Sequence, residues 1–198
     1  MKTSINFKAV KSDSEIHNFR KKSFDYIRKD LTHKNEYWME QKIADQIQKI
    51  ESYCKEKSGR KLQKNAMPIR EAVVVIKENT TMQDLHNLSK RLEEELKIRI
   101  FQIAIHKDEG HYDKDTKEWK PNYHAHLVAD WQDLQTGKTL KHQSFHYSKM
   151  QDLAAECLEM ERGVSGSLAR LEAVEFKIKK KEEDLKILEE RYQEMQQE

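Results

Sequence analysis

The feature that most limits how this chain can fold is the shortness of its apolar runs. The longest uninterrupted run, Ala72 to Ile76, reads Ala-Val-Val-Val-Ile. A helix that spans a bilayer needs about 18 or more consecutive apolar residues, so the sequence excludes a membrane-spanning protein. A short β-branched run is instead typical of a strand covered on both faces. We therefore expect residues 71–77 to form a central strand.

Hydrophobic spacing over residues 1–163 predicts one α+β domain, a mainly antiparallel sheet with helices packed on it. Apolar residues make up only 36% of the chain and charged residues another 36%, so part of the chain must lie outside any core. Residues 107–120 are predicted to form a polar loop. We expect strands at 4–10, 71–77, 99–106 and 123–130, and helices at 14–26, 43–58, 81–96 and 148–161.

Within the predicted helices, apolar residues recur every three or four positions, which identifies the side that faces the sheet. Ile16, Phe19 and Phe24 are expected to face inward from the first helix. Thr80 or Thr81 is the expected N-cap of the third helix. The second and third helices carry longer stripes, which are Ile43, Ile47, Ile50 and Cys54 in one and Leu85, Leu88, Leu92 and Leu96 in the other.

Beyond Gly163 the pattern becomes that of a coiled coil. Eight positions are spaced alternately three and four residues apart, and seven of them are apolar: Leu171, Val174, Ile178, Lys181, Leu185, Leu188, Tyr192 and Met195. We expect residues 164–198 to form a helical extension that pairs either with a second copy of the chain, as a homodimer, or with another chain. The alternative is a single amphipathic helix folded back on the domain.

Charge is distributed unevenly along the chain. Residues 1–70 contain 17 Lys and Arg against 9 Asp and Glu, a net charge of +8, and the total of +2 leaves −6 for the remainder. A basic region favours binding to a polyanion such as nucleic acid, although solvated basic helices have the same composition. Arg60, Lys61 and Lys64 form a basic connector, and their side chains are candidates for contacts with DNA phosphates.

The cysteines and the N-terminus both favour a cytoplasmic protein. Cys54 and Cys157 lie far apart without the spacing of metal ligands, so neither a disulfide framework nor a thiolate zinc site is indicated. The N-terminus has no apolar segment of the kind found in secretion signals. We expect the protein in the cytoplasm.

Histidines are concentrated in one short segment. Four of the nine, His106, His111, His124 and His126, fall within residues 106–126. His124 and His126 are two residues apart on a predicted strand and therefore point to the same face. A hairpin would place His106 beside them, with Glu109 three residues later. An isolated His-x-His pair is often incidental, but three imidazoles and a carboxylate favour a divalent metal site whose metal the sequence does not identify.

These motifs resemble those of the Mob/Pre plasmid-mobilisation relaxases, a branch of the HUH endonuclease superfamily. That family has His-x-Asp-Glu followed by Pro-His-x-His, and this chain has His-Lys-Asp-Glu at 106–109 and Pro-Asn-Tyr-His-Ala-His at 121–126. His-Asn-Phe-Arg at 17–20 is similar to the family's His-Asn-x-Arg motif. The partial matches are Asn35-Glu36-Tyr37, Glu71, Arg60 eleven residues before Glu71, and Gly-Lys-Thr-Leu at 137–140. The resemblance covers residues 1–163.

The chain departs from the family between the two histidine motifs. Residues 110–120 separate Glu109 from Pro121, whereas the family has only a few residues there, and Pro121 is not directly joined to His124. The longer segment makes His111 an alternative fourth ligand to Glu109.

The resemblance implies a relaxase that nicks single-stranded or hairpin DNA at an origin of transfer and holds the 5′ end covalently during strand transfer. It implies Mn²⁺ or Mg²⁺ held by His106, Glu109, His124 and His126. It also assigns the nucleophile to His17, in place of the tyrosine of most HUH enzymes, with a phosphoramidate as the intermediate. Arg20 is expected to clamp the same phosphate, Glu71 to orient or deprotonate His17, and Tyr37 to lie at the DNA.

Two other functions fit the same sequence. One is an HUH replication initiator or transposase, which shares the metal site but attacks with a tyrosine, here Tyr26 or Tyr37. The other is a non-catalytic coiled-coil DNA-binding protein whose histidines are structural. His142 and His146 are four residues apart, and we interpret that spacing as coincidental rather than as a second metal site.

Overall fold

The computed structural model describes residues 1–24, 26–113, 115–163, 178, 181–182, 185–186 and 188–193. The chain divides into two units, Met1–Arg162 and Gly163–Glu198. In the part of the chain that the structure describes, there is no helix with the length and apolar character needed to cross a membrane.

The first unit is built on a five-stranded antiparallel sheet. Its strands, in spatial order, are β2 (Ile5–Ala9), β4 (Ile69–Val75), β8 (His124–Asp130), β5 (Arg99–His106) and β3 (Glu36–Met39). β1 (Lys2–Thr3) pairs with β9 (Glu161–Arg162), and β6 (Gly110–Tyr112) pairs with β7 (Trp119–Pro121). The fold class predicted from the sequence, α+β with a mainly antiparallel sheet, is confirmed.

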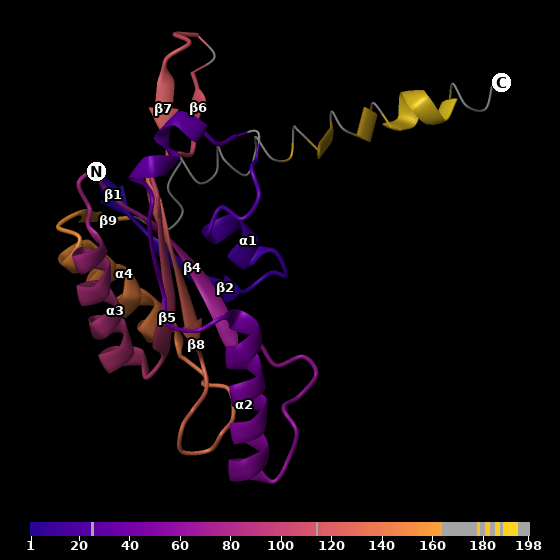
Figure 1. The fold of residues 1–198 in the computed structure, drawn as a ribbon, viewed down its shortest axis with the longest axis vertical. Coiled ribbons are helices and arrows are strands. Elements are labelled where there is room, and N and C mark those ends of the chain that lie inside the picture. Colours follow the sequence, from indigo (N-terminus) through magenta and orange to yellow (C-terminus); the bar gives the residue numbers. More distant parts are fainter. Residues whose placement is uncertain are drawn as a thin grey trace. The chain divides into compact units, whose positions relative to one another are not determined.

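Helices cover both faces of this sheet. α3 (Met82–Leu96) and α4 (Ser144–Cys157) lie on one face, and α1 (Ser14–Asn18) and α2 (Ile43–Ser58) lie on the other (Figure 1). A 3₁₀ helix, η1 (Lys29–Lys34), precedes β3. The sheet is thus the middle layer of three.

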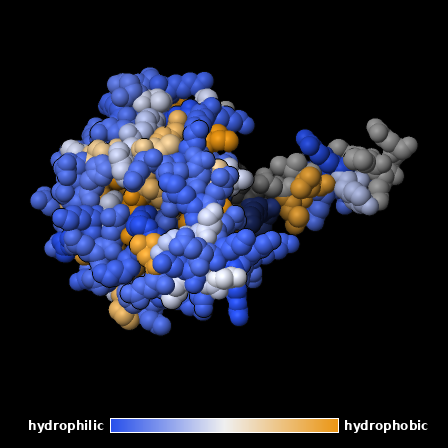
Figure 2. Space-filling model, turned by 60° about the horizontal axis from the view of Figure 1, so that its bottom comes forward, coloured by the Kyte–Doolittle hydropathy of each residue, from blue (hydrophilic) through white to orange (hydrophobic). Residues whose placement is uncertain are grey.

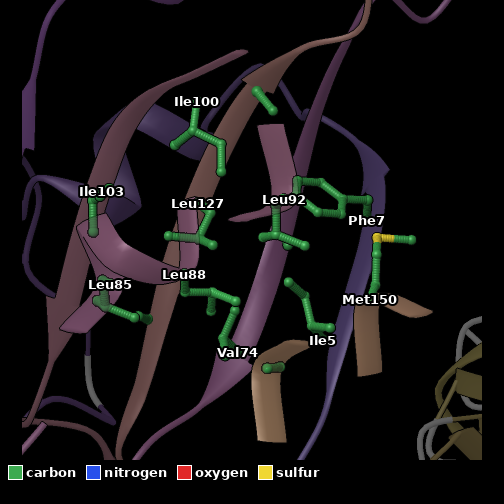
Figure 3. Close-up of a cluster of buried hydrophobic side chains, with 14 of the residues drawn as sticks. Ile5, Phe7, Val74, Leu85, Leu88, Leu92, Ile100, Ile103, Leu127 and Met150 are labelled. Carbon is green, nitrogen blue, oxygen red and sulfur yellow. The ribbon is translucent and has the colours of Figure 1, made fainter. Parts of the chain in front are cut away.

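The face under α3 and α4 carries the main hydrophobic core. α3 begins at a capping box formed by Thr81 and Asp84, and its predicted leucine stripe is buried against the sheet. Figure 3 shows these leucines meeting Ile5 and Phe7 of β2, Val74 of β4 and other apolar side chains of β5, β8 and α4. The opposite face has a smaller cluster beneath α2, formed by Ile50, Ile69, Phe101 and Val128.

Side chains alternate between these faces along β8. Ala125, Leu127 and Ala129 belong to the main core, whereas Val128 joins the α2 cluster on the other side. His124 and His126 have the same parity as Val128, so they face α1 and α2. Polar residues are therefore held at the end of a sheet whose strands are anchored elsewhere by apolar packing.

The first predicted helix is much shorter than expected. It ends at Asn18 instead of continuing to about residue 26, and Ile16, expected to face inward, is 39% exposed. Ser14 and Asn18 are the buried residues, because their side chains donate hydrogen bonds to the carboxylate of Glu71. The hydrogen bonds to Glu71 on the sheet, and not the apolar spacing, therefore decide which side of this helix faces inward.

Three further expectations need correction. Val73 was expected under cover on both faces, but it is 47% exposed because only the α3 side of β4 is packed there. Residues 107–120 were expected to be a loop, but they contain the β6–β7 hairpin. The last helix begins four residues earlier than expected and ends at Cys157, since the chain then turns to place β9 beside β1.

The second unit is described at few positions. Ile178, Leu185, Leu188 and Tyr192 of the predicted seam are helical and exposed. Leu171, Val174 and Met195 lie outside the described residues, so the coiled coil stays a prediction.

Candidate metal centre

Four histidines converge at one end of the sheet. His106 ends β5 and pairs with His124 across the strands, as the hairpin argument predicted, and His126 follows on β8. His17 approaches from α1. Each of the four offers one ring nitrogen, and these four nitrogens all lie within 4.8 Å of one another. A cluster of this size can hold one metal ion.

In two of these histidines, the ring nitrogen that points away from the cluster is hydrogen-bonded to a backbone carbonyl. His106 Nε2 lies 2.9 Å from the carbonyl oxygen of Asn18, and His124 Nδ1 lies 2.7 Å from that of Asn122. Because a carbonyl can only accept, each of these nitrogens must carry the hydrogen. His106 Nδ1 and His124 Nε2, 3.3 Å apart, are then left with lone pairs that face each other. This is the arrangement that orients imidazole ligands around a metal.

The third imidazole is oriented by a carboxylate. His126 Nδ1 donates to Glu71 Oε1 at 2.7 Å, and His126 Nε2 is buried with no hydrogen-bond partner. A buried nitrogen without a partner is costly, and a bound cation would satisfy it. The residues present therefore fit a divalent metal ion.

Glu71 is held in place by three donors. Ser14 Oγ and Asn18 Nδ2 each donate to its carboxylate at 2.6 Å, in addition to His126. Burial alone would raise the pKa of Glu71, but the hydrogen bonds from His126, Ser14 and Asn18 lower it to about 2. These contacts join Glu71 to His126, whereas the sequence-based hypothesis had it act directly on His17.

Glu109 lies among the imidazoles. Its carboxylate oxygens are 3.4 Å from His17 Nε2, 3.5 Å from His106 Nδ1 and 3.7 Å from His124 Nε2. Burial would raise its pKa, but His106, His124 and Arg20 lower it to about 2. Glu109 is therefore ionised and close enough to three of the four histidines to serve as a further ligand, whereas His111 is exposed on β6.

His17 is the least buried of the four histidines. Burial lowers its pKa to about 4, so the ring is neutral at physiological pH and keeps a lone pair. Tyr26 Oη lies 3.3 Å from His17 Nδ1, with Glu109 at the other nitrogen. Tyr37 instead accepts a hydrogen bond from Asn35 and packs on Phe19. Of the two tyrosines considered as nucleophiles, Tyr26 is therefore the one that contacts His17.

Arg20 is committed to carboxylates instead of facing an open cleft. Its guanidinium donates to both oxygens of Asp108, at 2.6 and 3.1 Å, to Glu109 at 2.7 Å and to the carbonyl of His17 at 2.9 Å. Only 8% of its side chain is exposed. The expected clamp on a phosphate does not match this geometry, and the contacts instead fix Glu109 and His17 relative to each other.

Sequence reasoning gave no role to several residues that support the site. Asp108 is fully buried and also accepts a hydrogen bond from Thr32 Oγ1 at 2.9 Å. Asn35 Oδ1 accepts from the backbone N–H of Lys107 at 2.8 Å. Ser14 donates to Glu71 from α1. The spacing of Ser14 and Asn18, four residues apart on one helical face, was the signal available in the sequence.

The candidate DNA contacts lie on a separate loop. Arg60, Lys61 and Lys64 are exposed between α2 and β4. Lys64 lines a groove of about 410 Å³ that includes Ala9, which also lines the cleft beside His17. His142 is not part of a second metal site, because Trp131 Nε1 donates to its Nδ1 and its Nε2 donates to the carbonyl of Leu96.

Comparison with known proteins agrees with this fold. No family model and no curated protein matches the sequence. Among solved structures, the fold is that of a MobV-type relaxase domain, as the motifs predicted.

Two similar structures are crystal structures of the MobM relaxase domain (MOBV; Mob_Pre), Mn-bound and with 22 nucleotides of plasmid pMV158 oriT DNA, at pH 5.5 and pH 4.6. Each is 16% identical to this chain and covers 85% of it, with TM-scores of 0.61 and 0.60. The matches cover 93% and 94% of the MobM chains. A third, with 3′-thiophosphate DNA at pH 6.8, is 15% identical, with the same 85% and 93% coverage and a TM-score of 0.61.

Proposed function

We propose that this chain is a metal-dependent DNA relaxase of the cytoplasm. It nicks one strand of single-stranded or hairpin DNA at an origin of transfer during mobilisation of a plasmid or other mobile element. It keeps the 5′ end on His17 through strand transfer. The observation that carries this proposal is the convergence of a neutral His17 on three oriented imidazoles and Glu109. The DNA-bound, Mn-bound MobM domains with the same fold support it.

His106, His124, His126 and Glu109 would hold a divalent ion, Mn²⁺ or Mg²⁺. When bound, such an ion supplies positive charge to the non-bridging oxygens of the scissile phosphate. Glu71 keeps the unprotonated Nε2 of His126 directed into the site. Arg20 positions Glu109 and the backbone of His17, so it acts through these residues and not as a ligand of phosphate.

His17 performs the covalent step. Its ring lone pair forms a P–N bond while the bond from phosphorus to the 3′ oxygen breaks, and that oxygen then takes a proton from solvent to become a 3′ hydroxyl. The product is a 5′-phosphoramidate, which a released strand's 3′ hydroxyl can reverse. Arg60, Lys61, Lys64 and Tyr37 are assigned to DNA contacts outside the reacting centre.

The test uses single-stranded oligonucleotides with a randomised centre, since no target sequence is needed in advance. Full-length protein with Mn²⁺ should form a covalent adduct that survives denaturing electrophoresis, disappears in mild acid and is stable to base. Exhaustive chelation should abolish it. His17→Ala should give no adduct, whereas Tyr26→Phe and Tyr37→Phe should retain most of it.

A Mn²⁺ titration of the same variants separates nucleophile from ligand. If His17 is the nucleophile, His17→Ala retains Mn²⁺ affinity within a few-fold, while His126→Ala loses it. A His17→Ala variant that also loses Mn²⁺ would make this histidine a fourth ligand. An acid-stable adduct that requires Tyr26 or Tyr37 would show the tyrosine chemistry of an initiator or transposase.

A non-catalytic DNA-binding protein would bind these oligonucleotides without forming any covalent adduct.

The extension at 164–198 is proposed to dimerise the chain. Removing it should lower the mass measured by light scattering and leave Mn²⁺ binding intact, and an unchanged monomeric mass before and after truncation would argue against pairing.

A further inference from the structure

A cleft of about 460 Å³ is lined by His17 and His126 of the histidine cluster. Its floor comes from β2 and β4 and includes Lys8 and the exposed side chain of Val73. Cavities of several hundred Å³ are the size that encloses small organic groups, and a nucleotide falls in this range. The cleft is therefore large enough for one component of a DNA strand next to His17.

One wall of the cleft is an aromatic pair. The rings of Phe24 and Tyr26 stack on each other, with centroids 5.5 Å apart and planes inclined by 19°. Both rings contact His17, at centroid distances of 5.7 and 6.4 Å. Tyr26 is 48% exposed, so its ring is accessible from the cleft that it lines. A flat exposed ring beside a nucleophile is a surface on which an unpaired base can stack.

The charges around the cleft favour an anion. Lys8 and Lys11 line it, and no ion pair of theirs is found among the described residues. Asp13 also lines the cleft and opposes them, but the second carboxylate, Glu71, is already engaged by three donors. Among the described residues that line the cleft, two lysines therefore outnumber the one carboxylate that these donors do not engage, which suits a phosphodiester chain.

We propose that this cleft is a subsite for the nucleotide adjacent to the scissile phosphate. The base stacks on Phe24 and Tyr26, the sugar lies over Val73, and the neighbouring phosphate is attracted by Lys8 and Lys11. The proposal rests on the proposed function and specifies the state of its substrate, because a base can reach this wall only when it is unpaired. Stacking also accepts any base, so the cleft selects single-stranded DNA but does not select a base sequence.

The experiment compares two labelled single strands of equal length by fluorescence anisotropy, with full-length protein in EDTA to prevent cleavage. One strand has a mixed sequence, and the other is abasic at every position. Wild-type protein should bind the base-carrying strand about tenfold or more tightly, the effect expected of base stacking. Phe24→Leu combined with Tyr26→Leu should remove most of that preference, while Tyr26→Phe should keep it.

Two further variants complete the test. Tyr147→Ala, an exposed aromatic of α4, is the matched control and should change neither affinity. Lys8→Gln with Lys11→Gln should weaken both strands equally and reduce the salt dependence of binding. Thermal unfolding of each variant checks that it is folded, and single Phe24→Leu and Tyr26→Leu variants replace the double variant if it is not.

The outcomes separate the two proposals. If adducts form but the folded leucine variants bind both strands like wild type, the subsite is wrong and the proposed function stands. If the preference for bases depends on Phe24 and Tyr26 but no adduct ever forms, the cleft is a stacking site for an unpaired base, and the nicking function fails together with the assignment of that base to a scissile phosphate.

Discussion

The two faces of β8 are built from alternate residues of one strand, yet they have opposite characters. Ala125, Leu127 and Ala129 are fully buried in apolar contacts beneath α3 and α4. His124 contacts His106 at the end of β5 and Glu109 in the loop after it, while His126 contacts Glu71 of β4 and its ring lies 5.1 Å from that of His17 in α1. On the surface shown in Figure 2, hydrophobic atoms occur in small separate patches within a largely hydrophilic face.

This difference shows how a stable sheet accommodates a site whose groups are unfavourable to bury. The apolar face gains free energy from burial alone, about 25 cal/mol per Å². The polar face buries three imidazoles and holds two ionised carboxylates that are only 12% and 14% exposed, and such groups are unfavourable to bury unless every partner is present. We infer that the α3 face supplies stability and the α1 face supplies chemistry, and the following predictions test that division.

The largest effect is expected on the apolar face. Leu127→Ala should lower the free energy of unfolding by about 2–5 kcal/mol, because it removes a fully buried side chain and leaves a cavity. Denaturant unfolding measures the loss, and a Mn²⁺ titration of the folded fraction should show unchanged affinity. A large drop in Mn²⁺ affinity would mean that the two faces are not separable.

Glu71→Gln, on the polar face, should affect Mn²⁺ binding rather than the free energy of unfolding. The amide cannot accept from Ser14, Asn18 and His126 as the carboxylate does, so His126 loses its orientation. Mn²⁺ affinity should fall roughly 10- to 100-fold, as for other residues that orient metal ligands. Glu156→Gln, an exposed glutamate paired with Arg91, is the control and should leave the affinity unchanged.

Gly110→Ala tests the link between the β6–β7 hairpin and the site. A Cβ at this position would lie 2.4 Å from the carbonyl oxygen of Lys120 and 2.6 Å from the Trp119 ring, so the backbone next to Glu109 must shift. We expect about 1–3 kcal/mol of destabilisation together with weaker Mn²⁺ binding. Gly59→Ala should also destabilise the protein, because Gly59 has φ +68, a conformation that favours glycine. This variant should not change Mn²⁺ affinity. Equal Mn²⁺ affinities in both variants would show that the hairpin does not position Glu109.

The smallest effect concerns a histidine on the apolar side. Burial lowers the pKa of His142 below its ordinary 6.5, and the indole of Trp131 needs its unprotonated Nδ1. The unfolded chain therefore binds a proton more readily than the native state does. The stabilisation from this group should be complete above pH 6.5 and be lost as pH falls through the lower native pKa.

His142→Gln should flatten that part of the pH profile, because the amide keeps an acceptor for Trp131 and a donor for Leu96 without titrating. Denaturant unfolding between pH 7.5 and pH 5 would measure the slope. A slope identical to that of wild type would show that other groups account for it.

Short-range patterns predicted much of the fold because they depend on local geometry. The leucine stripe of α3, the end of α2 before Gly59 and the span of β5 follow from helical and strand periodicity, and each matches the structure. The cross-strand pair of His106 and His124 followed from the order of the strands. Motif resemblance added the expectation of a relaxase fold.

The sequence by itself determined most of the long strands and helices, the pairing of the strands that carry His106 and His124, and which residues are able to bind a metal. Only the tertiary structure decided that Glu71 orients His126, that Arg20 is occupied by Asp108 and Glu109, and that His17 joins the imidazole cluster. These contacts join residues more than 50 positions apart, where neither periodicity nor spacing carries information. Their partners are chosen by the need to satisfy buried polar groups, which exists only once the chain is packed.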